Sequence, residues 1–196
     1  DLARTLFAVL GSIGQQIRAD LKTEMPKVAI LAEKAVWTEA IVAAAQKSLP
    51  GMKMEVVGTW QPSATATDVT AELSAIDRSG AQIVFTALSG PVGISVGRQM
   101  GERGMKAVAW GINVEGQKEE FWQAAAGKAQ YVSTLDTYAE VEMTPKTIPF
   151  VRAFKDRYKK APTYTAATYD AIMTLRSVIE EAGTTNADKL VPLIEK

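Results

Sequence analysis

The sequence of 196 residues contains no histidine and no cysteine. Without histidine, a Ser-His-Asp triad and histidine-ligated zinc are excluded, and the side chain that most often acts as a general base is missing. Without cysteine, thiol nucleophiles, iron–sulfur clusters and disulfides are excluded as well. Most hydrolase chemistry is therefore ruled out. The lack of cysteine does not fix the compartment, because oxidising compartments permit disulfides without requiring them.

An excess of charge of one sign is also missing, because 22 Lys and Arg residues balance 22 Asp and Glu residues. A neutral chain without a polybasic run has no field that attracts nucleic acid or an anionic membrane, so neither is expected as a partner. The longest apolar run, near residues 40–45, is far shorter than the roughly 20 residues that span a bilayer. The apolar content of 47% is typical of a protein that buries a core.

Short β-rich runs alternate with helical stretches over the first two thirds of the chain. The runs cover residues 28–31, 54–57, 83–86, 107–110 and 131–134. Their spacing is what a strand, a crossover helix and two short loops require. An amphipathic helix is expected before the first run, over residues 1–22. The sequence therefore predicts an α/β fold with a doubly wound parallel sheet.

The pattern changes after Tyr138, which marks a predicted domain boundary between residues 1–138 and 139–196. The segment 139–146 is polar and irregular, and three helical stretches follow it. Gly183 is expected to end the second of these helices, and Asn186 to cap the third.

Chemically useful side chains follow several of the predicted strands, at the edge where an open parallel sheet binds ligands. They are an aromatic ring, a hydroxyl beside a glycine-rich turn, and a carboxylate: Trp37, Ser89, Gly90 and Glu115. Each also has a structural interpretation. The tryptophan can pack on a neighbouring loop, the Ser-Gly pair can form a turn and cap, and the glutamate can favour a helix dipole. The glycine-rich turn matches neither the dinucleotide fingerprint nor the P-loop.

Seven short segments follow one another along nearly the whole chain in an order and spacing that resemble one family. They are 27–31 (KVAIL), 33–37 (EKAVW), 67–70 (TDVT), 114–116 (VEG), 162–164 (PTY), 168–171 (TYDA) and 180–183 (EEAG). The family is that of the solute-binding proteins of branched-chain amino-acid ABC transporters. These are type I periplasmic binding proteins, of the leucine/isoleucine/valine-binding kind.

The resemblance implies two α/β lobes that close on a ligand held between them. Residues 1–138 would supply the second lobe, and residues 139–196 would return to the first lobe, whose sheet is absent from this chain. We therefore expect the chain to be part of a longer protein that carries a signal peptide, and the isolated chain to self-associate.

The resemblance also implies a ligand site. An aromatic residue, usually tyrosine in the family, covers the ligand, and Trp37 occupies its place. Glu115 would receive the ligand's ammonium group, and Tyr164 would line the pocket for the ligand's side chain. Ser89 and Gly90 stand in the loop where the family often carries tyrosine.

The function implied is that of a periplasmic or extracellular receptor that captures an amino acid or related small carboxylate and delivers it to an ABC permease. No reaction, cofactor or metal is expected. An enzyme of the doubly wound class is the first alternative, but we find no acid–base constellation at a suggestive spacing. The second is the ligand-sensing lobe of a receptor or transcription regulator with the same fold.

Overall fold

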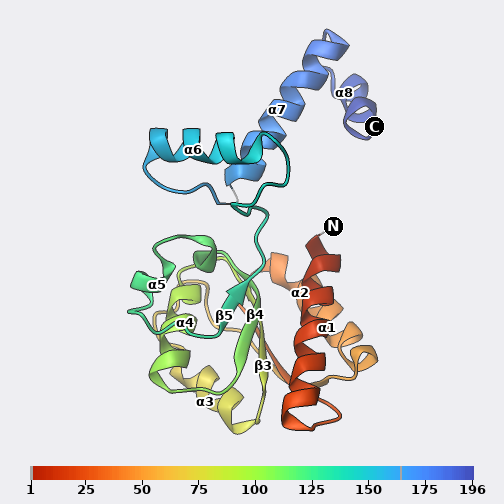
Figure 1. Ribbon diagram of the computed structural model, residues 1–196. Coiled ribbons are helices and arrows are strands. Elements are labelled where there is room, and N and C mark those ends of the chain that lie inside the picture. The colour runs from red at the N-terminus through yellow and green to blue at the C-terminus, as the bar shows by residue number, and fades with distance from the viewer. Residues whose placement is uncertain (1, 164) are drawn as a thin grey trace. The chain divides into compact units, whose positions relative to one another are not determined.

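The computed structural model describes residues 2–163 and 165–196, which form two compact units that meet in the sequence between Leu135 and Asp136 (Figure 1). This division lies close to the boundary placed at Tyr138 from the sequence. The assignment of the units to the second lobe and to helices that return to a first lobe stays a prediction.

The first unit is built on one parallel sheet of five strands in the order β2-β1-β3-β4-β5. The strands are β1 (Lys27–Ala32), β2 (Glu55–Trp60), β3 (Ile83–Leu88), β4 (Val108–Asn113) and β5 (Val132–Thr134). The predicted doubly wound parallel sheet is therefore confirmed. The direction of winding reverses between β1 and β3, which makes the carboxyl ends of these two strands the switch point of the sheet.

Two strands extend further than the sequence indicated. β2 continues to Trp60 and β4 to Asn113, beyond the predicted runs 54–57 and 107–110. The reason is pairing: Trp60 stands opposite Leu31 of β1, and Asn113 stands opposite Leu88 of β3. Pairing with residues that are distant in the sequence thus keeps Trp60 and Asn113 in their strands. The apolar runs alone predict shorter strands.

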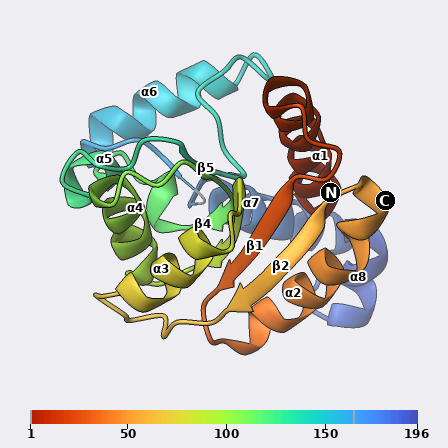
Figure 2. The same cartoon turned by 90° about the horizontal axis from the view of Figure 1, so that it is seen from below.

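Helices cover both faces of the sheet, as the layers in Figure 1 and the view from below in Figure 2 show. One face packs on α1 (Leu2–Leu21) and α2 (Val36–Ser48), and the other on α3 (Thr70–Arg78) and α4 (Val92–Glu102). A short helix, α5 (Phe121–Ala124), and two 3₁₀ turns, Pro50–Met52 and Glu115–Gln117, complete this unit. Gly80 and Gly104, which follow the last turns of α3 and α4, both have the positive φ typical of a helix C-terminus.

The first helix, α1, is anchored in the core of this unit. Leu6 and Leu10 are buried against the sheet, and the ring of Phe7 stacks on that of the buried Phe85 at a centroid distance of 5.9 Å. The indole N–H of Trp110 in β4 donates to the carbonyl of Leu6 at 2.9 Å. Apolar burial and a buried hydrogen bond therefore both fix α1 to the sheet.

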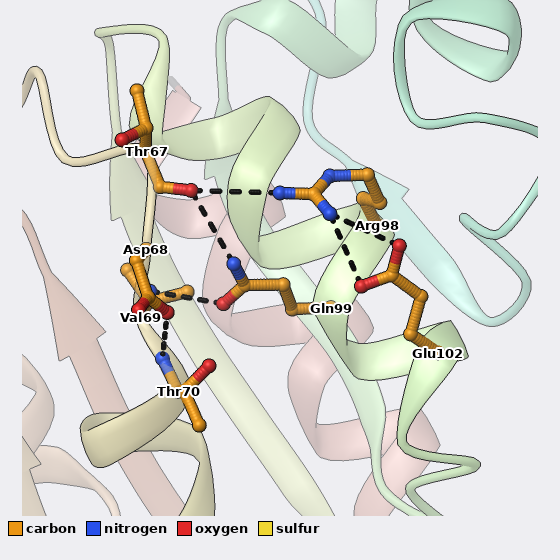
Figure 3. A network of polar contacts seen from close by, with 7 residues as sticks. All are labelled: Thr67, Asp68, Val69, Thr70, Arg98, Gln99 and Glu102. Atoms are coloured by element: carbon orange, nitrogen blue, oxygen red, sulfur yellow. Dashed lines mark hydrogen bonds and ion pairs between the residues drawn. The ribbon is translucent and has the colours of Figure 1, made fainter.

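The loop between β2 and α3 is fastened to α4 by the network in Figure 3. The buried Gln99 accepts from the N–H of Val69 at 2.9 Å and donates to the carbonyl of Thr67 at 3.3 Å. Asp68 accepts from the N–H of Thr70 at 2.9 Å, and the hydrogen bonds from Thr70 hold the pKa of the Asp68 carboxyl below its usual value. The segment 67–70 thus stabilises the start of α3.

The second unit contains the three predicted helices, α6 (Thr147–Tyr158), α7 (Thr165–Ala182) and α8 (Ala187–Ile194). Gly183 ends α7 at a φ of 62°, and the side chain of Asn186 caps α8 by accepting from the N–H of Asp188, so both predictions are confirmed. The rings of Phe150 and Tyr169 pack at 5.0 Å and join α6 to α7. Among the helices within the described ranges, none has the length and apolarity needed to cross a bilayer.

Candidate ligand site

The carboxylate of Glu33 joins the two loops at the switch point. Glu33 directly follows β1, and only 1% of its surface is exposed. Oε2 accepts from the backbone N–H groups of Ser89 at 2.7 Å and Gly90 at 2.9 Å. Oε1 accepts from the indole N–H of Trp37 at 2.9 Å and from the hydroxyl of Ser89. One buried carboxylate thus bridges the loop after β1 and the loop after β3.

The electrostatics of Glu33 follow from this environment. Burial alone would raise the pKa of the carboxyl, because it penalises the charged form. The hydrogen bonds from the side chain of Ser89, the backbone of Gly90 and Ser89, and the side chain of Trp37 outweigh burial, so the pKa of Glu33 lies below its ordinary value of 4.5. The carboxylate is therefore charged at neutral pH.

Trp37 lies in the first turn of α2 with 38% of its surface exposed. Its ring is thus not buried in the core of the unit. Because the indole N–H donates to Glu33, the polar edge of the ring is already in use. What this side chain offers to solvent or to a ligand is the apolar ring.

Ser89 and Gly90 are brought together with Trp37 through Glu33, and their N–H groups and the serine hydroxyl all donate to that carboxylate. Gly90 also passes close to the loop after β2: a Cβ at this position would lie 2.3 Å from the carbonyl oxygen of Ala64. Only glycine allows this approach without a shift of the backbone. The loop after β3 is therefore fixed on two sides.

Glu115 begins the 3₁₀ turn that follows β4, and its side chain is 15% exposed. Its Oε1 forms an ion pair with Nζ of Lys118 at 2.7 Å. The lysine side chain is 40% exposed. Glu115 therefore already has a cationic partner from its own turn.

The turn that carries Glu115 is held by Asn113, which is fully buried at the end of β4. Its amide nitrogen Nδ2 donates to the carbonyl of Gly93 at 3.2 Å, and its Oδ1 accepts from the N–H of Gly116 at 3.3 Å. The backbone N–H of Asn113 donates to the hydroxyl of Thr134 at 2.9 Å. Asn113 thus links the ends of β4 and β5 to the start of α4.

The sequence pointed to Trp37, Ser89, Gly90 and Glu115 as site residues. It did not point to their partners: Glu33 bonds to the first three, and Lys118 forms an ion pair with Glu115. A charged residue directly after a fully apolar strand was the available signal for Glu33. The fifth predicted residue, Tyr164, lies outside the described residues. The ligand-binding roles of all five stay predictions. Where the structure is described, no group of three or more acidic side chains is placed to hold a metal ion.

The family model described as "Periplasmic binding protein" matches residues 5–196, and the chain belongs to this family. This match confirms the resemblance inferred from the sequence. The search of curated protein sequences found no match. The family is one of binding proteins and not of enzymes, in agreement with the expectation of a binding module.

Solved structures share the fold. A leucine-binding protein, LivK, from Thermotoga maritima superposes with a TM-score of 0.80 at 17% identity, covering 95% of this chain and 53% of that chain. LivJ from Streptococcus pneumoniae, in complex with isoleucine, gives 0.74 at 20% identity, covering 93% and 51%. A solute-binding protein of an ABC transporter from R. palustris, in complex with benzoate, gives 0.71 at 22% identity, covering 91% and 50%. The chain thus spans about half the length of these relatives.

Proposed function

We propose that the full-length protein is an extracytoplasmic solute-binding receptor of an ABC importer that captures an amino acid or a related small carboxylate between two lobes. The observation that carries this proposal is the family match over residues 5–196. The solved relatives with the same fold are described as transporter components that hold amino acids or benzoate. In this proposal residues 1–138 form the second lobe, and the bound solute passes to a membrane permease.

The ligand would contact this lobe at the carboxyl ends of the strands, through Trp37, Ser89, Gly90 and Glu115, which follow β1, β3 and β4 in the sequence. Tyr164 would contribute from the other part of the chain. The charged and polar groups at these strand ends hold the loops in place through fixed hydrogen bonds. Such a prearranged surface suits reversible capture, because little order has to be gained on binding.

The compartment follows from the same proposal. A receptor of this kind works in the periplasm or outside the cell, and the full-length protein would carry a signal peptide. Fractionation of cells that produce the full-length protein tests this point: the proposal predicts recovery in the periplasmic or extracellular fraction, and retention in the cytoplasm would contradict it.

A thermal-shift screen of the full-length protein tests the binding function. The panel should contain amino acids, aliphatic and aromatic carboxylates, amides and sugars at equal concentration. A solute present at about 100 times its Kd adds about 2.7 kcal/mol to the free energy of unfolding, which gives a clear rise in melting temperature. We expect at least one amino acid or small carboxylate to do so. A panel in which none of these solutes shifts the transition would contradict the proposal.

A further inference from the structure

Several polar groups at the candidate site already have partners within the unit. The N–H groups of Ser89 and Gly90 and the indole N–H of Trp37 donate to Glu33. Glu115 is paired with Lys118. A ligand that relied on these groups would have to break an internal hydrogen bond or ion pair for each one that it gained.

The ion pair at Glu115 bears directly on the charge of the ligand. An α-ammonium group that approached Glu115 would meet a carboxylate whose Oε1 already binds the ammonium of Lys118 at 2.7 Å. The two ammonium groups would then repel each other at short range, or the lysine would have to be displaced. Lys118 thus stands in the place that a ligand ammonium would take, and it lowers the attraction of this turn for a cationic group.

Among the described candidate residues, Trp37 offers an apolar ring that its neighbours do not cover completely, because 38% of its surface is exposed. The ring is partly exposed, and its polar edge is bonded to the buried Glu33, so that it is held in one orientation. An aromatic face of this kind packs well against a flat apolar or aromatic group. It can also attract a cation, and the experiment below separates these two uses.

We propose that the ligand is a small carboxylate that lacks an α-ammonium group, with a flat apolar part that contacts Trp37, and that Lys118 sets this preference by neutralising Glu115. The inference rests on the proposed function and narrows it to one class of solute. Relatives with the same fold hold ligands of both classes: one binds benzoate and others bind isoleucine or valine. The Glu115–Lys118 pair is the feature of this chain that favours the first class.

Calorimetric titration of the full-length protein with benzoate and with leucine tests the preference. We expect benzoate to bind about tenfold or more tightly than leucine, which corresponds to the value of one hydrogen bond to a charged group. Tighter binding of leucine would overturn the inference. If neither probe binds, the solutes that shift the melting transition decide: amine-free carboxylates support the inference, and amino acids or uncharged solutes overturn it.

A lysine variant tests the role of the ion pair. Lys118→Gln removes the cation and leaves Glu115 free, so the ratio of the leucine Kd to the benzoate Kd should fall by about tenfold or more. Lys106→Gln is the matched control, because it removes the same charge just before β4, at the opposite end of that strand, and should leave the ratio unchanged. An unchanged ratio in Lys118→Gln would overturn the assigned role.

The proposed receptor function and the proposed ligand class are contradicted by different results. If no solute of the broad panel binds, the proposed receptor function itself is wrong. If an amino acid binds tightly and selectively, the receptor function stands and the inference about the ligand class is wrong.

Discussion

At the scale of single residues, Glu33 organises the candidate site more than any residue selected from the sequence. It accepts hydrogen bonds from Trp37 in the first turn of α2 and from Ser89 and Gly90 in the loop after β3, although it is separated from Ser89 by 56 positions in the chain. The hydrophobic pattern predicted where β1 and β3 lie, and hence that their ends would be close. It could not show which of the polar groups at these ends would bond to one another, because that depends on the register between the strands.

Replacing Glu33 with glutamine should destabilise the protein. The amide keeps one acceptor oxygen, and each of the two carboxylate oxygens, either of which its NH2 group can replace, accepts from two donors. A buried donor left without a partner costs about 1–3 kcal/mol in the free energy of unfolding, and because the donors to Glu33 are partly buried, we expect a loss near the lower end of this range. Chemical denaturation at pH 7 measures the loss, and Glu24→Gln at an exposed position serves as the control. Equal stability of the two variants would show that the Glu33 bridge contributes nothing.

The same carboxylate predicts a pH dependence. Because the pKa of Glu33 is lowered in the folded state, its contribution is present above the ordinary value of 4.5 and is lost as the pH falls through the lower folded-state value. The difference in unfolding free energy between the wild type and Glu33→Gln should therefore shrink below pH 4.5. A difference that stayed constant or grew on acidification would contradict the assignment. Denaturation curves at several pH values decide between these results.

At the scale of elements, the existence and type of the helices and strands were predictable, but the strand ends were not. Apolar runs and helical periodicity located all five strands of the sheet. β2 and β4 nevertheless continue to Trp60 and Asn113 because residues on neighbouring strands pair with them. This matters for the site, since Asn113, which lies beyond the predicted run 107–110, is buried in the sheet and positions the turn of Glu115.

The hydrogen bonds of Gln99 hold the loop between β2 and α3 against α4, and a substitution of Gln99 tests how much they stabilise the protein. Gln99→Met keeps the size of the side chain but leaves the buried N–H of Val69 without its acceptor. We expect a loss of about 1–3 kcal/mol in the free energy of unfolding. Gln46→Met, at an exposed position of α2, is the matched control and should change stability by less than about 0.5 kcal/mol. Similar denaturation midpoints for both variants would refute the structural role of Gln99.

At the scale of the whole molecule, the chain divides into two units and spans about half the length of its solved relatives. The change of pattern near Tyr138 made the division predictable from the sequence. What the second unit packs against was not predictable, because amphipathic stripes identify a face but not its partner. Large apolar side chains on α7 are exposed in the structure, among them Tyr169, Ile172 and Leu175.

These exposed side chains predict the behaviour of the isolated 196-residue chain. Apolar surface left in water is unfavourable by about 25 cal/mol for each Å², and large contiguous patches are uncommon on soluble monomers. We expect the isolated chain to self-associate through the unit that contains α7. Light scattering at tens of micromolar measures the mass; a clean monomer would contradict the expectation, and Ile172→Glu should reduce the association by placing a charge in the apolar face.

The proposed receptor function requires that the full-length protein binds a small solute reversibly and performs no reaction on it. The most direct test is equilibrium dialysis with a solute that raises the melting temperature, followed by mass spectrometry of the solute released on denaturation. We expect a saturable amount of solute, no more than one per protein chain, recovered chemically unchanged after prolonged incubation. Time-dependent conversion of the solute by the pure protein would contradict it.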